Sequence, residues 1–288
     1  MVLRAITTAL VGLTLVACTA PGKRLDAVAA GLGFERVVVR GTAFNHVVYR
    51  NAAWEANDKP LHVYLDGDGS PWLNRRQIAP EPTPREPLVL EWMVQDSAPS
   101  VYLGRPCYHG EASTPPCTPL LWTLRRYAPE IIDSMAAALR TINPARRQRP
   151  LVLIGYSGGG ALAMLLAERV PETTAVLTIA GNLDITAWAD LHGYTPLYGS
   201  LNPTTQAPLP PRIAQLHYSG GKDANIPPAL SRAALERQPC AILIEVPSYE
   251  HVCCWRQKWS DILANLDKVQ QNHLEPRVAL QQGGCRVP

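Results

Sequence analysis

The sequence has no large excess of charge of either sign and no long basic run. Its 27 Lys and Arg residues against 24 Asp and Glu residues give a formal net charge of +3. The basic residues are scattered and gather only in short clusters such as Arg75-Arg76. Proteins that bind nucleic acid concentrate basic residues on one face or along one helix. We therefore expect no nucleic-acid partner.

The sequence also lacks the spacings that typify structural metal sites. None of its cysteines stands in a Cys-x-x-Cys arrangement, which argues against zinc. The segment Asp66-x-Asp68-x-Ser70 alternates oxygen ligands as a calcium loop does, but its sixth place is Pro71 and its twelfth is Gln77, where such a loop has glycine and glutamate. We expect neither a metal nor a cofactor.

No apolar run is long enough to span a membrane as a helix of the mature protein. The run from Ala5 to Ala17 follows the basic Arg4 and ends at Leu15-Val16-Ala17-Cys18, which predicts a signal peptide over residues 1–17. The order of a basic residue, an apolar core, a small residue and a cysteine resembles a bacterial lipoprotein signal, with Cys18 as the lipidated residue. The alternative is a signal peptide cut elsewhere, with Cys18 removed.

Lipidation would make the protein an exported lipoprotein of the bacterial cell envelope, held to the membrane by its acyl chains. Thr19 after the cysteine resembles sorting to the outer membrane, facing the periplasm or the cell surface. The predicted organisation is then a signal peptide over residues 1–17, a lipidated linker over residues 18–34 and one domain over residues 35–288.

Export bears on the six cysteines that follow Cys18, because an even number in an oxidising compartment predicts disulfides. Cys107 and Cys117 enclose one short loop and are expected to pair with each other. Cys253 and Cys254 are adjacent and are expected to take Cys240 and Cys285 as separate partners, in either order.

Short apolar, β-branched runs alternate along the chain with stretches of helical spacing. The first two expected strands lie close together and the others are separated by longer segments. The expected strands are Val37–Arg40, His46–Tyr49, Leu61–Asp66, Ser100–Leu103, Leu151–Tyr156, Ala175–Ala180, Ala214–Tyr218 and Ala241–Val246, and the expected helices are Leu121–Ile142, Ala161–Val170 and Trp255–Gln270. This order predicts an α/β fold with a doubly wound, mostly parallel eight-stranded sheet. The irregular segment Asp184–Pro211 is expected to be a short lid-like insertion.

Gly155-Tyr156-Ser157-Gly158-Gly159 directly follows one of these strands and directly precedes a helix. A serine on a sharp turn between a strand and a helix needs glycines on both sides, because the two elements approach closely there. Strand, G-x-S-x-G and helix in this order resemble the nucleophile elbow of the α/β-hydrolase superfamily. The resemblance implies that Ser157 is a nucleophile.

A serine nucleophile requires a histidine base and an acid that orients it, and the superfamily has them in the chain order serine, acid, histidine. His251 follows the last expected strand and precedes the last helix, which is the position of the family's base. Asp223 lies in a turn after the strand ending at Tyr218, where these hydrolases place their acid. Asp184 is the alternative acid, because it follows the strand Ala175–Ala180, where some members carry theirs.

The resemblance also implies an oxyanion hole of two main-chain N–H groups. Gly158 supplies the first. Leu65-Asp66-Gly67-Asp68-Gly69 resembles the family's His-Gly-x-Gly loop and supplies the second from Asp68, with Asp66 where the histidine usually stands.

The chain further resembles bacterial lipoprotein hydrolases of the esterase and lipase-like type. The shared segments are Asp-Gly-Asp-Gly, Arg105-Pro106-Cys107, Gly-Tyr-Ser-Gly-Gly and Asn182-Leu183-Asp184. The resemblance implies acyl transfer on a small-molecule or lipid ester, with amide or peptide hydrolysis as a second possibility. The rivals are a non-catalytic envelope scaffold and a thiol enzyme using Cys253 or Cys254 beside His251.

Overall fold

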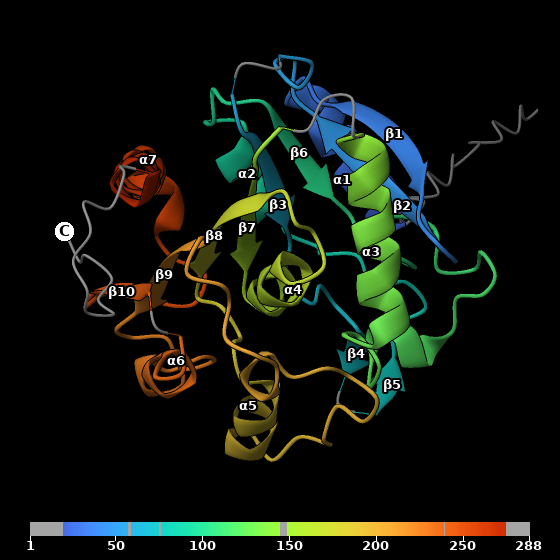
Figure 1. The fold of residues 1–288 in the computed structure, drawn as a ribbon. Coiled ribbons are helices and arrows are strands. Elements are labelled where there is room, and N and C mark those ends of the chain that lie inside the picture. Colours follow the sequence, from blue (N-terminus) through green and yellow to red (C-terminus); the bar gives the residue numbers. More distant parts are fainter. Residues whose placement is uncertain (1–19, 57–58, 75, 145–148, 239, 275–288) are drawn as a thin grey trace, which may run out of the picture.

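The computed structural model describes residues 20–56, 59–74, 76–144, 149–238 and 240–274, and it contains every strand that the sequence predicts. The strands of the main sheet are β1 Glu35–Arg40, β2 Asn45–Arg50, β3 Leu61–Leu65, β6 Ser100–Leu103, β7 Leu151–Tyr156, β8 Thr173–Ile179, β9 Ala214–Gly220 and β10 Ala241–Val246. They pair in the order β1-β2-β6-β3-β7-β8-β9-β10 (Figure 1).

Strand directions agree with the mostly parallel sheet that the sequence predicts. β1 pairs antiparallel with β2, and β2 pairs antiparallel with β6. From β6 through β10 every pair is parallel. The carboxyl ends of these six strands therefore meet at one edge, which we call the carboxyl edge, and the loops that leave it are the place where such sheets build their sites. The predicted fold class is confirmed.

Helices cover both faces of the sheet. The helices are α1 Pro21–Gly31, α2 Leu88–Met93, α3 Pro129–Ile142, α4 Gly158–Ala167, α5 Ile185–Leu191, α6 Pro228–Leu235 and α7 Trp259–Leu274, with 3₁₀ turns at Pro119–Trp122, Pro203–Thr205 and Trp255–Lys258. α3 and α4 pack into the apolar core on one face, and α1, α2 and α7 pack into the core on the other (Figure 1). Every residue of α4 is buried, as expected for a central helix that is apolar on all sides.

The helix predicted over Leu121–Ile142 is shorter than expected. A 3₁₀ turn, Pro119–Trp122, comes first, and α3 begins only at Pro129. Proline lacks the N–H that a helix interior needs, but it fits the first turn, where that N–H has no helical acceptor. The apolar period before Pro129 therefore belongs to a separate buried turn, and its prediction as helix was wrong.

The predicted linker over residues 18–34 is also corrected in part. Residues 21–31 form α1, whose Leu25 and Ala29 are buried against the sheet. These two residues are four apart and share one helix face, which gives α1 an apolar side to bury. The predicted signal peptide and Cys18 lie outside the described residues. Within the ranges described above, no helix combines the length and the apolar character that crossing a bilayer requires.

The segment predicted as a lid-like insertion, Asp184–Pro211, carries α5 and the turn Pro203–Thr205. A second, two-stranded sheet that the sequence did not predict pairs β4 Trp72–Asn74 with β5 Gln77–Ile78. Both features leave the carboxyl edge, after β8 and β3 respectively.

Candidate active site

Ser157 stands on the turn between β7 and α4, in the conformation that the elbow motif predicts. Its φ of 52° and ψ of −121° are unusual for a residue with a side chain. Ser157 N donates to Ile179 O at 3.0 Å, and Ser157 O accepts from Asn182 N at 2.8 Å, so the neighbouring strand holds the turn. A Cβ on Gly155 would collide with the main chain of Gly159, which explains the glycines on either side of the serine.

The structure brings together the three residues predicted as a triad. Ser157 Oγ lies 3.0 Å from His251 Nε2, and His251 Nδ1 lies 2.8 Å from Asp223 Oδ2. The Asp223 side chain is fully buried, whereas 18% of the His251 side chain is exposed. The imidazole therefore has a carboxylate on one nitrogen and the serine hydroxyl on the other, with an opening to solvent beside it.

Main-chain hydrogen bonds fix the acid and the base relative to each other. Asp223 Oδ1 accepts from the N–H groups of Asn225 and Ile226, both at 2.8 Å. Lys222 N donates to Tyr249 O at 2.8 Å, which ties the turn after β9 to the loop after β10. Parallel pairing of β9 with β10 brings the two loops side by side.

Asp184, the alternative acid, has a different role in the structure. Its Oδ1 accepts from Thr186 N and Ala187 N at 3.1 Å each, and from Asn202 Nδ2 at 2.8 Å. These bonds make it the N-cap of α5. The carboxylate that contacts the imidazole is that of Asp223.

Asn225 is a site residue that sequence reasoning missed. Its Nδ2 lies 3.0 Å from His251 Nε2, and its Oδ1 accepts from Trp188 Nε1 of α5 at 3.3 Å. An indole N–H only donates, so Trp188 fixes the amide with its oxygen toward α5 and its nitrogen toward the base. The position two residues after Asp223 was the available signal, but spacing alone does not reveal a contact with an imidazole 26 residues away.

The predicted oxyanion loop lies against the elbow. A Cβ on Gly67 would be 3.4 Å from the Cβ of Ser157, and a Cβ on Gly158 would collide with the Asp68 carboxylate. Gly158 is the first residue of α4, so its N–H has no acceptor within the helix. Neither this N–H nor that of Asp68 has an acceptor among the described residues. Both are therefore available to an oxygen bound beside Ser157.

The side chain of Asp68 anchors this loop, a function that the sequence did not reveal. Its carboxylate pairs with Arg105 at 2.9 Å and Arg126 at 2.8 Å, and it accepts from the Tyr127 hydroxyl. Burial raises the pKa of Asp68, but the charges of Arg126 and Arg105 outweigh burial and lower it below the ordinary value. The Arg-Pro-Cys segment had pointed to Arg105 without assigning it a partner.

Asp66, at the start of the same loop, is in a less polar environment. Its carboxylate accepts from Gly67 N at 2.7 Å and from the Tyr102 hydroxyl at 3.1 Å. Burial is the largest influence and raises the pKa of Asp66 to about 6, although these bonds and Arg105 oppose the shift. The described residues contain no cluster of three or more His, Cys, Asp or Glu side chains suited to a metal ion.

The disulfides follow the prediction only in part. Cys107 and Cys117 are bonded, with 5.5 Å between their Cα atoms. Cys253 and Cys254 are bonded to each other and not to Cys240 and Cys285 as separate partners, so that prediction was wrong. Cys240 is itself disulfide-bonded, and Cys285 lies outside the described residues. The prediction of separate partners did not consider a bond between adjacent cysteines.

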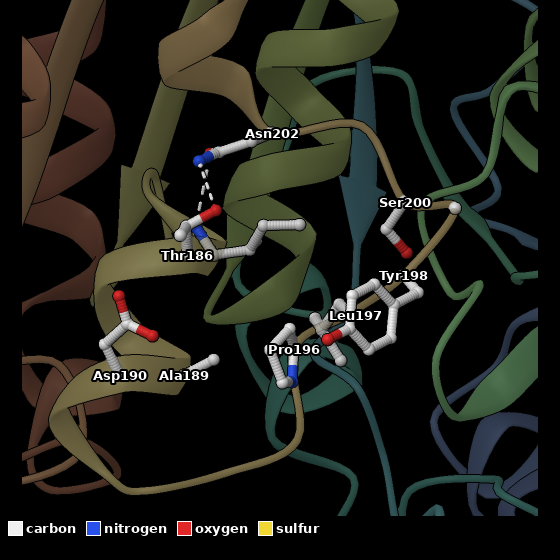
Figure 2. A pocket seen from close by; sticks show the side chains of 10 residues that line it. Thr186, Ala189, Asp190, Pro196, Leu197, Tyr198, Ser200 and Asn202 are labelled. Atoms are coloured by element: carbon white, nitrogen blue, oxygen red, sulfur yellow. Dashed lines mark hydrogen bonds between the residues drawn. The ribbon is translucent and has the colours of Figure 1, made fainter.

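A pocket of about 270 Å³ lies between α5 and the segment that follows it. Figure 2 shows Pro196, Leu197 and Tyr198 on one side and Ala189 and Asp190 on the other. Its lining residue Ser200 accepts a hydrogen bond from Tyr127 N at 3.1 Å. Tyr127 also bonds Asp68, so one residue connects the pocket wall to the oxyanion loop.

Comparison with known proteins finds similarity in structure and not in sequence. No protein-family model and no curated protein matches the chain. An esterase from Pyrococcus furiosus superposes with a TM-score of 0.59 at 12% identity, over 84% of this chain and 92% of that one. The enzyme Est1E from Butyrivibrio proteoclasticus, solved with ferulic acid bound, gives 0.59 at 11% identity, over 81% and 98%.

A third solved structure, a membrane phospholipase A described as a bacterial virulence factor, gives a TM-score of 0.56 at 14% identity, over 87% of this chain and 92% of that one. Identities this low establish a shared fold and not a shared activity. The strand order, the elbow after β7 and these superpositions agree, and the chain has the α/β-hydrolase fold.

Proposed function

We propose that the chain is a serine hydrolase that cleaves carboxylic esters through an acyl-enzyme on Ser157. The observation that carries the proposal is the continuous hydrogen-bonded path from Ser157 Oγ through His251 to Asp223, at 3.0 and 2.8 Å. A serine hydroxyl becomes a useful nucleophile when an oriented base accepts its proton. This arrangement provides both the base and its orientation.

In the proposed reaction, Ser157 Oγ forms a bond to the ester carbonyl carbon while its proton passes to His251 Nε2. The N–H groups of Gly158 and Asp68 stabilise the negative charge on the carbonyl oxygen. Collapse of the intermediate breaks the bond to the alcohol, which takes the proton from His251. Water then attacks the acyl-enzyme by the same route, releasing the acid and restoring the serine. Asp223 stabilises the imidazolium in both halves.

An ester is the substrate class we favour. Two of the similar structures are named as esterases or were solved with an aromatic acid bound, and the third is named a phospholipase. We further propose, from the sequence before Thr19, that the enzyme is anchored by lipid on Cys18 at the bacterial envelope. Incorporation of an alkyne-labelled fatty acid that is lost in Cys18→Ala tests the anchor.

The test of the catalytic proposal is labelling of the full chain with a fluorophosphonate probe, together with hydrolysis of p-nitrophenyl esters of graded chain length. Ser157→Ala should abolish labelling and lower turnover by on the order of 10³ or more. Ser113→Ala, at an exposed serine distant in sequence, is the control and should retain both. Absence of labelling in the folded wild-type protein would favour a non-catalytic scaffold instead.

A further inference from the structure

Large apolar side chains that remain exposed are concentrated at the carboxyl edge. Among the described residues ten such side chains are exposed, and only Val38, within β1, and Val94, after α2, lie elsewhere. The other eight are Trp72, Leu73, Ile78, Leu120, Leu191, Tyr194, Tyr198 and Val252; we call them the apolar rim. They lie in segments that leave the carboxyl ends of β3, β6, β8 and β10.

The topology of the sheet places the apolar rim around the catalytic residues. Ser157 leaves β7 at the same edge, between the strands that supply the rim, and Val252 directly follows His251. Single exposed apolar residues are normal on protein surfaces, but a gathering around one opening indicates an interaction site. Its occupant must leave the triad reachable for substrate. A second protein seated flat on the edge would cover the serine, whereas a lipid surface supplies the substrate itself.

The hairpin β4–β5 supplies three members of the rim, and every described residue of its two strands is exposed. Trp72, Leu73 and Ile78 are 40%, 46% and 37% exposed. They stay exposed because an isolated two-stranded hairpin can bury little apolar surface by itself. Arg76, also exposed, lies between the two strands. Tryptophan and tyrosine with a nearby arginine suit the boundary of a bilayer, where the rings lie at the level of the headgroups beside the acyl chains and the cation meets phosphate. Tyr194 and Tyr198 add two such rings on the segment after α5.

The point of entry of the chain supports the same orientation. In the first turn of α1, a Cβ on Gly22 would collide with Glu81 and with the main chain of Gly110. These two residues follow β3 and β6, so α1 begins on the side of the carboxyl edge. Cys18 is two residues before Ala20, or about 7 Å of chain. A lipid on Cys18 would thus hold the domain with its rim on the side of the bilayer.

We propose that the apolar rim docks on a phospholipid surface and that the substrate is a long-chain acyl ester drawn from it. This rests on the proposed function for the reaction, but the docking itself does not require an active serine. The pocket beside α5, with Leu197 and Tyr198 in its wall, opens within the same region.

The docking is tested by fluorescence of the full chain on vesicles of phosphatidylcholine with brominated or unbrominated acyl chains. Bromine should quench the wild-type emission, and Trp72→Phe should remove most of that quenching. The matched control is Trp54→Phe. Trp54 O accepts from Arg149, just before β7, so this tryptophan lies at the opposite edge and its loss should leave the quenching intact. Equal quenching in all three proteins, or none in the wild type, overturns the proposal.

The substrate class is tested with the double variant Trp72→Ser/Leu73→Ser. Its rate on vesicle phospholipid should fall tenfold or more, while kcat/KM on p-nitrophenyl acetate stays within twofold of wild type. Val38→Ser/Val94→Ser is the control and should change neither rate. Equal losses of rate on both substrates overturn the proposal. It is also overturned if sedimentation shows a dimer that the rim variant converts to a monomer, because a second copy of the chain would then cover the rim.

Failures of docking and of catalysis are separable. Ser157→Ala should be quenched as strongly as wild type. Quenching without fluorophosphonate labelling would reject the proposed hydrolase but support docking. Ester hydrolysis without quenching would support the hydrolase but reject docking.

Discussion

At the residue scale, the two oxygens of Asp223 have different partners. Oδ1 accepts two main-chain N–H groups at 2.8 Å and so shapes the turn, while Oδ2 faces His251 Nδ1 at 2.8 Å. The turn therefore determines which oxygen meets the base. The imidazole is held with its proton on Nδ1 and its lone pair on Nε2, the form that can accept a proton from Ser157.

We predict that Asp223→Asn lowers kcat/KM for esters by on the order of 10³–10⁴ without unfolding the turn. The asparagine oxygen can keep both main-chain bonds, but its NH₂ then faces Nδ1 and favours the tautomer whose Nε2 carries a proton. Ester kinetics with circular dichroism as the fold check measure this effect.

Asp184→Asn is the matched comparison at the other candidate acid. Asparagine caps a helix about as well as aspartate does, so α5 should persist and kcat/KM should stay within about threefold of wild type. The opposite ranking of the two variants would transfer the role of the acid to Asp184.

The sequence could predict Ser157, Asp223 and His251 because each belongs to a local pattern of a strand, a turn and the element that follows. Asn225 and the Asp68 carboxylate follow no local pattern. Their contacts with His251, Arg105 and Arg126 join loops that come together only when the sheet has formed. Motif reasoning predicted a role for the Asp68 N–H, but the ion pairs that hold the Asp68 side chain depend on the tertiary fold.

At the scale of elements, two disulfides have both cysteines among the described residues, and they differ in how much chain they constrain. Cys107–Cys117 closes a loop with a sequence separation of 10 and has a fully buried cysteine at one end. Cys253–Cys254 joins neighbours and closes no loop. A crosslink stabilises mainly by restricting the unfolded chain, and this restriction grows with the size of the closed loop.

We predict that Cys107→Ser/Cys117→Ser lowers the free energy of unfolding by about 3 kcal/mol, whereas Cys253→Ser/Cys254→Ser lowers it by less than about 1 kcal/mol. Urea unfolding followed by circular dichroism compares the two variants under identical conditions. A larger loss in the Cys253/Cys254 variant would show that the adjacent bridge stabilises the folded state through more than chain entropy.

Elements differed in how far the sequence could define them. All eight strands of the main sheet were predictable. Most of the parallel strands are continuous apolar runs bounded by turns, and the antiparallel strands β1 and β2 each contain a run of valines that favours strand structure. The start of α3 was misplaced, because Leu121 and Trp122 continue the apolar period into a separate turn before Pro129. The hairpin β4–β5 has two very short strands in which every residue is exposed, so it shows no alternation of buried and exposed residues that a pattern could reveal.

At the scale of the whole molecule, a buried carboxyl at the site affects how global stability depends on pH. The pKa of Asp66 is about 6 in the folded chain against an ordinary value of 3.8. The folded state therefore binds the proton more tightly than the unfolded state does. The sign follows: stability contributed by this group is complete below about pH 4, declines as pH rises, and is lost above about pH 6.

We predict that Asp66→Asn removes this decline. The amide keeps an oxygen for Gly67 N, and the Tyr102 hydroxyl can turn to accept from the new NH₂, so the loop retains its bonds without a buried charge. A pKa raised from 3.8 to about 6 corresponds to about 3 kcal/mol. The unfolding free energy of the variant minus that of wild type should thus rise by roughly this amount between pH 4 and pH 8. Urea titrations at steps of one pH unit measure this difference.

Asp267→Asn, at an exposed position of α7, is the control, and its difference from wild type should not change with pH. A flat difference for Asp66→Asn as well would mean that the carboxyl ionises in the folded chain as readily as in the unfolded one.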